Sequence, residues 1–442
     1  MYLTEVKVIR DKGFYKEIDG YCEKCKNLYN LTNYTINQIY RIACKMAKDE
    51  ELEDWEGAFI ENVNEGIDIY NRSGRTEKHV KHISKDRKTM TDFYFVNWYM
   101  RGATYFYDTL PLITSGQRVI EELCNAWKGY YSLLDRYNQG KIKSKPNKPG
   151  YKDKKNGRAD FVITKAHFKQ IGNKLILSKR LNNYVIRTNK TNIQQIRLIT
   201  EKGYVKAKIV YKVADKELKR DNGRYYSIDL GINNLMTVVS NIKGINPIII
   251  NGKPLKSVNQ YYHKEFARLQ SICNTVNNLE TTKRLGQLTD KRNRKINDYM
   301  HKVSRMVIER AKEDNISKIV VGKNTNWKQR MLMGKKGNQN FSFIPYNKLI
   351  NMLRYKGQIE GIEVIEVEER YTSGTSYIDE EFPCKDNYDK TRRIHRGLFR
   401  TNKGITINAD VNGAYQILKK ADLVGYLGYK GAERVEKVRK TA

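Results

Sequence analysis

An aspartate in the middle of an apolar stretch is the first residue whose position points to chemistry. Asp229 lies in Tyr-Tyr-Ser-Ile-Asp-Leu, residues 225–230, which has the character of a strand; a tight turn at residues 231–234 and a second strand follow. A carboxylate in such a strand is costly to bury unless it is paired or binds a cation. Asp229 is therefore predicted to bind a metal ion.

A second aspartate, Asp410, lies at the expected start of a helix. Asn408 can cap this helix, and Asp410 falls in its first turn, where the helix dipole favours an ionised carboxylate. Taken alone, an aspartate in this position is more often structural than catalytic. The two aspartates become informative together, because both lie in motifs of one family.

These motifs resemble those of TnpB, a family of transposon-encoded RNA-guided nucleases, and more distantly those of the miniature type V CRISPR effectors. The resemblance covers nearly the whole chain. Its specific motifs lie in the C-terminal half, while the helical segment matches only by placement and general character. The matching stretches are residues 148–152, 227–234, 250–260, 318–329, 338–346, 371–373 and 408–415.

The resemblance implies an RNase H-like (RuvC) domain in which three acids hold two Mg²⁺ ions, about 3.5–4 Å apart. One ion would activate water and the other would stabilise the leaving oxygen; Mn²⁺ is an alternative metal. Asp229 and Asp410 carry over directly as catalytic and metal-binding residues.

The third acid does not carry over to its usual place. Most relatives have a glutamate after the fourth strand, but residues 322–327 here are Gly-Lys-Asn-Thr-Asn-Trp. One interpretation moves the acid to the tip of the neighbouring strand, as Glu368 or Glu369. Alternation favours Glu368, because Glu366 and Glu368 would share one face and Glu368 lies nearer the strand end. The other interpretation is a solvated strand end and a crippled nuclease.

Zinc-ribbon cysteines are missing from the interval where relatives often carry two C-x-x-C pairs. Thr375 and Ser376 occupy the place of the first pair, and Cys384 is the one cysteine between the Tyr-Thr-Ser motif and Asp410. Four thiolates cannot be assembled from one, so no structural zinc is expected. Cys22 and Cys25 also lack a second pair and fall in an expected helix, which favours a structural role.

The charge of the chain is strongly one-sided. Lys and Arg number 83 against 49 Asp and Glu, giving a net charge of +34. Such an excess opposes the compact state unless a polyanion offsets it, so nucleic acid is the expected partner. A coding bias towards Lys would raise the bases without removing acids. By resemblance, the partners are a transposon-derived guide RNA, on which the protein would be monomeric, and a double-stranded target DNA.

Basic residues in three regions are candidate nucleic-acid contacts. Residues 140–158 contain eight bases, one acid and an embedded tyrosine, and read as a linker that becomes ordered on nucleic acid. Two expected helices, 255–279 and 283–314, carry cations that can grip an A-form guide–target duplex. The loop 379–400 can line the path of the cut strand; solvated surfaces are the simpler alternative throughout. The candidates are Lys148, Tyr151, Lys152, Lys264, Arg268, Arg292, Arg294, Lys295, Arg392, Arg393 and Arg396.

The order of helical and strand-like segments that must position these residues predicts a multidomain α+β architecture. The first ten residues alternate like a strand, apolar residues then recur at three and four, and strand-like segments with turn signals follow before an α/β region. The predicted parts are residues 1–15, the first strand of a small wedge β-barrel; 16–139, a helical recognition domain; 140–158, a basic linker; 159–222, the rest of the barrel; and 223–442, a RuvC-like nuclease domain.

Targeting signals are absent from the sequence pattern. The first residues contain no apolar segment of signal-peptide length, and no later run approaches about 18 apolar residues, which disfavours export and membrane insertion. Six scattered cysteines argue against a disulfide framework. A cytoplasmic protein is expected.

The expected function is RNA-guided DNA cleavage by two-metal-ion phosphodiester hydrolysis, with specificity supplied by base pairing. One alternative is an RNA-guided DNA-binding repressor that no longer cuts, which the missing glutamate after Val321 favours and the intact Asp229 and Asp410 oppose. Another is a transposition accessory or RNA-binding protein without catalysis, whose basic surface is its whole function.

Overall fold

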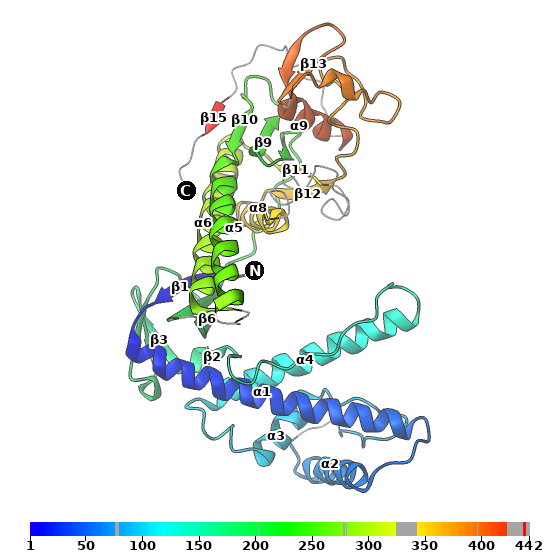
Figure 1. Ribbon diagram of the computed structural model, residues 1–442, viewed down its shortest axis with the longest axis vertical. Coiled ribbons are helices and arrows are strands. Elements are labelled where there is room, and N and C mark those ends of the chain that lie inside the picture. The colour runs from blue at the N-terminus through cyan, green and yellow to red at the C-terminus, as the bar shows by residue number, and fades with distance from the viewer. Residues whose placement is uncertain are drawn as a thin grey trace. The chain divides into compact units, whose positions relative to one another are not determined.

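The chain folds into two compact units, Met1–Val213 and Ala214–Ala442 (Figure 1). Each unit combines helices and sheets, so the predicted α+β multidomain class is confirmed at that level. In the part of the chain that is described, no helix is both long enough and apolar enough to span a bilayer. The structure, a computed structural model, describes residues 1–75, 79–201, 203–276, 279, 281–323, 343–395, 397–421 and 436–438.

The described part of the first unit contains four α-helices. The longest begins where Asp11 accepts a hydrogen bond from the Phe14 amide, at 2.8 Å, as an N-cap. Cys22 and Cys25 are both buried on this helix, and burial raises the pKa of the Cys22 thiol to about 12. Both cysteines therefore behave as apolar core residues. The helices are α1 (Lys12–Met46), α2 (Asp54–Arg72), α3 (Phe93–Ala103) and α4 (Ile113–Asn138).

The strands of the first unit form two sheets. The larger is antiparallel, in the order β1-β7-β6-β2, and the smaller is β3-β4-β5. Among the described residues β1 pairs with β7 alone and β2 with β6 alone, so the larger sheet is open. Its apolar face is covered by α1 instead of by closure, which corrects the predicted barrel. The strands are β1 (Tyr2–Ile9), β2 (Phe161–Thr164), β3 (Phe168–Ile171), β4 (Lys174–Leu177), β5 (Val185–Arg187), β6 (Ile193–Glu201) and β7 (Tyr204–Lys212).

Residues 148–158, here called the strap, lie along α1 and are held there by their backbone. Asn30 donates to the Lys152 carbonyl and accepts from the Lys152 amide, both at 2.9 Å. Asn33 donates to the Pro149 carbonyl at 3.0 Å. Donors at three- and four-residue spacings share one helix face, so α1 presents a row of them to the strap. The predicted linker is therefore ordered by α1 itself over this stretch.

The second unit is built on one mixed sheet in the order β12-β11-β8-β9-β10-β15. Strands β8, β9 and β10 are antiparallel neighbours, whereas β11 and β12 run parallel to β8. Gly252 lies against the turn between β8 and β9, because a Cβ there would come within 2.1 Å of the Ile232 carbonyl oxygen. The strands are β8 (Tyr225–Leu230), β9 (Asn234–Ser240), β10 (Ile248–Asn251), β11 (Lys318–Gly322), β12 (Glu363–Val367) and β15 (Glu436–Val438).

Helices cover both faces of this sheet, and that arrangement aims the side chains of β8. Tyr226, Ile228 and Leu230 join a core with α6 and α8, while Tyr225 packs with the far end of α9. Side chains alternate along a strand, so Asp229 points to the α9 side. The helices are α5 (Lys253–Val276), α6 (Lys283–Glu313), α8 (Tyr346–Glu360) and α9 (Ala409–Lys420); short strands β13 (Leu398–Arg400) and β14 (Thr406–Asn408) precede α9.

Replacing Asn30 by alanine is expected to loosen the strap without unfolding α1. Two hydrogen bonds to the Lys152 backbone are lost, together worth about 2 kcal/mol, so amide exchange at Lys152 should accelerate about 30-fold. Hydrogen exchange read by mass spectrometry measures this. Asn37→Ala is the matched control, because Asn37 accepts a hydrogen bond from the Lys148 side chain and, over the described residues, has no hydrogen bond to the strap backbone; equal exchange in the two variants would contradict the role of Asn30.

Candidate functional site

Asp229 and Asp410 approach each other across the β8–α9 contact. Asp410 lies in the first turn of α9, whose cap is Asn408: its Oδ1 accepts from the amides of Asp410 and Val411 at 3.0 and 3.1 Å. One turn on, Gly413 faces β8, and a Cβ there would lie 3.2 Å from Asp229 Oδ2. The glycine therefore lets α9 come close to the buried aspartate.

Glu369, rather than Glu368, is the third acid at this place. Strand β12 ends at Val367, and a Cβ on Gly322, the last residue of β11, would lie 3.1 Å from Glu369 Oε2. Glu368 is 48% exposed, 3.8 Å from Arg370. The alternation that favoured Glu368 holds only within a strand, and the chain turns after Val367, where the Thr372 amide donates to the Glu369 carbonyl.

The three carboxylates line one pocket of about 870 Å³ within the second unit. They come from the end of β8, the turn after β12 and the start of α9, three segments distant in sequence. Residues 324–327 belong to the stretch in which most relatives would carry the third acid, and they lie outside the described residues. The rest of the wall is formed by Leu230, Gly231, Ile232, Asn233, Asn234, Arg370, Tyr371, Thr372, Ser373, Tyr388, Arg393, Ala409 and Gly413.

The pocket destabilises the ionised forms of Asp229 and Glu369. Burial, followed by the charges of Glu369 and Asp410, raises the pKa of Asp229 well above its usual value, and Arg393 opposes the shift. Burial raises the pKa of Glu369 to about 7, against the influence of Lys420. Carboxylates in this situation stay protonated or take a cation.

Two neighbours hold Asp410. Asn234 Nδ2 donates to Asp410 Oδ2 at 2.7 Å, and Arg393 Nη2 lies 3.3 Å from Oδ1. The sequence interpretation did not single out Asn234, and its only signal is its position at the end of the β8–β9 turn. Arg393, predicted as a nucleic-acid contact, is here the cation beside the carboxylates.

The donor set suits hard divalent cations, which take carboxylate oxygens as ligands. Over the described ranges, no three His, Cys, Asp or Glu side chains are gathered tightly enough to enclose one ion. Asp229, Glu369 and Asp410 thus line a shared pocket without forming a single-ion cage. The donor type fits Mg²⁺ or Mn²⁺, and Asp410 would have to give up its pairing with the Arg393 guanidinium to hold either ion.

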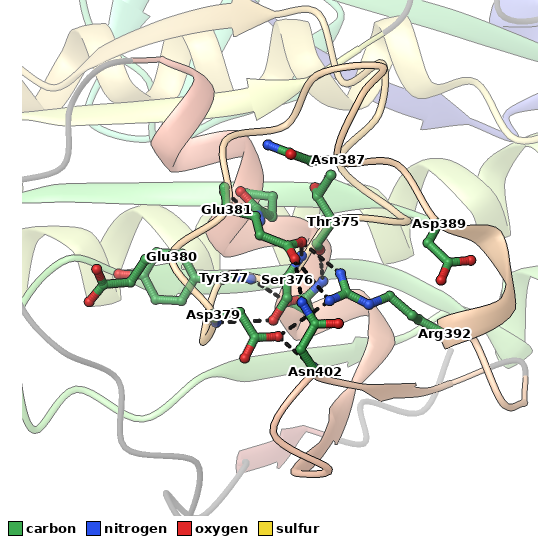
Figure 2. A network of polar contacts seen from close by, with 12 residues as sticks. Thr375, Ser376, Tyr377, Asp379, Glu380, Glu381, Asn387, Asp389, Arg392 and Asn402 are labelled. Carbon is green, nitrogen blue, oxygen red and sulfur yellow. Dashed lines mark hydrogen bonds and ion pairs between the residues drawn. The ribbon is translucent and has the colours of Figure 1, made fainter.

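The loop that precedes α9 is fastened by a buried ion-pair network around Arg392 (Figure 2). Arg392 donates to both carboxylate oxygens of Glu381, at 2.6 and 2.8 Å, and lies 3.5 Å from Asp379. Asn402 donates to the same two acids, at 2.7 and 2.9 Å. The Arg392 side chain is only 9% exposed, so Arg392, predicted as a nucleic-acid contact, is committed to this network.

The same loop is tied to α9, the helix that carries Asp410. Asn412 donates to the Thr375 carbonyl at 2.7 Å and accepts from the Tyr377 amide at 3.0 Å; Gln416 donates to the Glu381 carbonyl at 3.1 Å. Thr375, which stands where relatives have a zinc ligand, is fully buried here. Polar contacts thus connect this loop to α9 at the position where a zinc ribbon would otherwise stand.

Nucleic-acid candidates in the first unit belong to the strap. Lys148 donates to Asn37 at 2.9 Å and lies over the Tyr40 ring, and Lys152 lies over the Tyr29 ring. Tyr151 is 54% exposed and presents its ring to solvent. Of the three, Tyr151 is the side chain best placed for stacking on a base.

Candidates on α5 and α6 differ in their surroundings. Arg268 pairs with Glu265 at 2.9 Å, and Arg292 is held by neutral acceptors described below. Lys264, Arg294 and Lys295 are exposed. Arg396 lies outside the described residues.

Two family models match the chain. One, described as a probable transposase of the OrfB_IS605 type, matches residues 208–328 and includes Asp229. The other, the TNB domain of Cas12f1-like proteins, matches residues 346–417 and includes Glu369 and Asp410. A TnpB-like protein of Acidianus two-tailed virus is 28% identical over 348 residues, which are 70% of this chain and 73% of the relative. Together these matches support a TnpB-type protein.

The resemblance inferred from the motifs of this TnpB-type chain is thereby confirmed. Solved structures similar to it include a Cas12f1–sgRNA–target DNA complex, at 13% identity and a TM-score of 0.34, with 94% of this chain and 98% of that chain covered. Alicyclobacillus acidoterrestris C2c1 with single-guide RNA matches at 10% identity and a TM-score of 0.39, covering 93% and 70%. At these TM-scores the overlap is loose, and the site rests on its own geometry.

Glu369→Gln is expected to stabilise the metal-free protein at high pH. The folded pKa of about 7 lies above the usual 4.5, so the ionised carboxylate lowers stability progressively as pH rises from 4.5 to 7, and fully above 7. Melting in EDTA should show the variant more stable at pH 8, by on the order of 1 kcal/mol, and unchanged at pH 4. Glu368→Gln is the control; an equal shift at both pH values would count against a buried Glu369.

Arg392→Ala is expected to release the loop from α9. Asp379 and Glu381 lose their buried countercharge, which typically costs about 3–5 kcal/mol. Hydrogen exchange should increase across residues 375–402, whereas Arg400→Ala, at an exposed neighbour, should leave it unchanged.

The zinc content of the purified protein tests whether this loop is held on α9 without a metal ion. The purified protein is expected to contain no stoichiometric zinc, and EDTA should not alter exchange in residues 375–402. One zinc ion per chain, or a loop loosened by chelation, would contradict a network that acts without metal.

Proposed function

We propose that this TnpB-type protein is an RNA-guided DNA endonuclease that cuts at Asp229, Glu369 and Asp410. The observation that carries the proposal is that three acids from distant segments line one pocket, where burial and the charges of Glu369 and Asp410 raise the pKa of Asp229. Stability alone gives no reason to gather them, because each added carboxylate raises the energy of the others. A site that binds cations does give a reason to gather them.

The sheet of the second unit supports an RNase H-like (RuvC) assignment. Three antiparallel strands are followed by two parallel strands on the β8 edge, and α9 crosses the face that carries Asp229. The acids lie at the ends of strands and at a helix start, where side chains are held by the scaffold while the pocket stays open to a phosphate chain.

Each residue has a role in this proposal. Bound Mg²⁺, or Mn²⁺, would supply the activated water and stabilise the leaving oxygen. Asp229 and Glu369 would hold the metal from the sheet side, and Asn234 would orient Asp410 through its hydrogen bond. Arg393, displaced from Asp410, would meet the scissile phosphate, since a guanidinium pairs well with phosphate oxygens.

The partners follow from charge and from the relatives. A net charge of +34 requires a polyanion. The Cas12f1 structure is a complex with sgRNA and target DNA. We propose that this chain likewise holds a guide RNA, as a monomer in the cytoplasm, and takes double-stranded DNA as its target, with base pairing supplying the sequence specificity.

A second candidate is an RNA-guided DNA-binding repressor that no longer cuts. It is favoured by the absence of a glutamate from residues 322–327 and by the pairing of Asp410 with Arg393. Both candidates predict guide-dependent binding, and only the endonuclease predicts metal-dependent cleavage.

Cleavage by the copurified ribonucleoprotein tests the proposal. The bound RNA is sequenced and a matching duplex is incubated with the complex and Mg²⁺. Asp229→Ala and Glu369→Ala should lower the cleavage rate more than about 100-fold, because even outer-shell changes at metal sites cost 10–100-fold. Binding of the matched duplex should persist.

Glu368→Ala is the matched control, one residue from Glu369 and outside the pocket, and should cleave normally. Guide-dependent binding without cleavage by the unsubstituted protein would favour the repressor. Full cleavage by Asp229→Ala would exclude this active site.

A further inference from the structure

We propose that the groove between α5 and α6 binds one unstacked nucleotide of the bound nucleic acid. This site is separate from the carboxylate pocket, and it rests on the proposed function only for the presence of a nucleic-acid partner. The groove has a volume of about 320 Å³ and lies within the second unit. Its chemical signature is a pair of tyrosine rings bordered by cations that have no acidic partner among the described residues.

Helix spacing brings the groove residues onto facing surfaces. Tyr261 and Tyr262 come from α5, and Lys291, Arg292 and Lys295 come from α6, at intervals of three and four residues. The Tyr262 hydroxyl is within 3.2 Å of Thr289 Oγ1 on α6, so its ring is fixed across the helix pair. The groove is therefore a built feature of the α5–α6 contact.

Arg292 lines the groove, and its guanidinium stays charged. Its Nε donates to Asn259 Oδ1 at 2.8 Å, and its Nη2 donates to the Phe343 carbonyl at 2.7 Å. The guanidinium lies over the rings of Tyr262 and Phe343, with its carbon 5.4 and 5.3 Å from their centroids. Its hydrogen-bond acceptors Asn259, Asn293 and Phe343 are all neutral, so they fix the guanidinium without neutralising it, and it is a fixed positive charge in the wall of the groove.

The exposed edge of the groove combines an aromatic ring with two lysines. Tyr261 is 60% exposed, a large ring left in solvent beside the cations. Lys291 and Lys295 are exposed, and among the described residues neither has an ion pair. About two and three turns along the same helix, Lys302 and Arg305 each pair with an acid four residues away. The cations at the groove are thus left for an external anion.

The shape and chemistry select a nucleotide. About 320 Å³ is at the lower end of the ~300–1,000 Å³ of small-molecule pockets, room for a single base and not for a duplex. A base can stack on Tyr261 while its phosphates meet Lys291 and Lys295, as in single-strand binding proteins. A duplex presents phosphates but hides its base faces, so an exposed aromatic ring points to an unpaired position.

Site-resolved photo-crosslinking of the full chain tests this assignment. The probes are a 12-nucleotide oligouridine carrying 5-iodouridine, its deoxy counterpart, and a 12-base-pair duplex with the same iodinated base. Mass spectrometry is expected to find the adduct on Tyr261 with the single strands, at several-fold higher yield than with the duplex. The two single strands together show whether the ribose or the deoxyribose form is preferred.

The variants separate stacking from charge. Lys291→Ala with Lys295→Ala should lower the yield at Tyr261 about tenfold at fixed oligonucleotide concentration, and raising the salt should lower it further. Tyr94→Ala, at a tyrosine that is 71% exposed on α3, should leave it unchanged. An abasic 12-mer of equal charge should compete less well than oligouridine.

Three results would overturn the proposal: no adduct on Tyr261, equal yield with the duplex, or competition by polyglutamate equal to that by oligouridine, which would indicate an acidic protein partner. The readout involves no cleavage and no metal. Its failure therefore leaves the carboxylate pocket untouched, and loss of cleavage in Asp229→Ala says nothing about the groove.

Discussion

The gathering of Asp229, Glu369 and Asp410 in one partly buried pocket is the constraint around which the site of the second unit is built. Burial raises the pKa values of Asp229 and Glu369, and repulsion from Glu369 and Asp410 adds to the shift at Asp229, so the metal-free protein loses stability near neutral pH. The surrounding fold offsets this with cations and amides placed at the rim, notably Arg393 and Asn234. A divalent metal would relieve the same repulsion more completely, and this is why the arrangement is readily explained as a catalytic site.

Small residues and a metal-free fastening keep the carboxylates together. Gly413 lets α9 approach Asp229, and Gly322 leaves space beside Glu369. A side chain at position 322 would compete with Glu369 for that space, because a Cβ there would lie 3.1 Å from Glu369 Oε2. The Arg392 network then holds the preceding loop on α9 and delivers Arg393 to Asp410.

Sequence reasoning anticipated the placement of residues whose surroundings are local. Asp229 lies in the expected apolar strand, and Asp410 lies in the first turn of the helix that Asn408 caps, while their binding of metal stays a prediction. Glu369 could not be separated from Glu368, because alternation fails where a strand ends and the end is set by tertiary contacts. Arg392 and Arg393 are adjacent in sequence but differ in environment. Arg392 is buried in ion pairs, and Arg393 lies at the pocket beside Asp410.

Longer-range pairing explains the remaining differences. The barrel was predicted from strand-like segments, but which strands pair, and whether the sheet closes, depends on α1 covering one face. The strap looked like a free linker because its own residues are basic and irregular, and the side chains that order it, such as Asn30 and Asn33, lie more than a hundred residues earlier.

The central claim is that the three carboxylates bind two divalent cations. Crystals of the full chain soaked in Mn²⁺ and measured for anomalous scattering test it most directly. The account predicts two peaks, about 3.5–4 Å apart, among Asp229, Glu369 and Asp410, with Arg393 turned away from Asp410. Anomalous density elsewhere in the chain, with these three side chains unchanged, would contradict it.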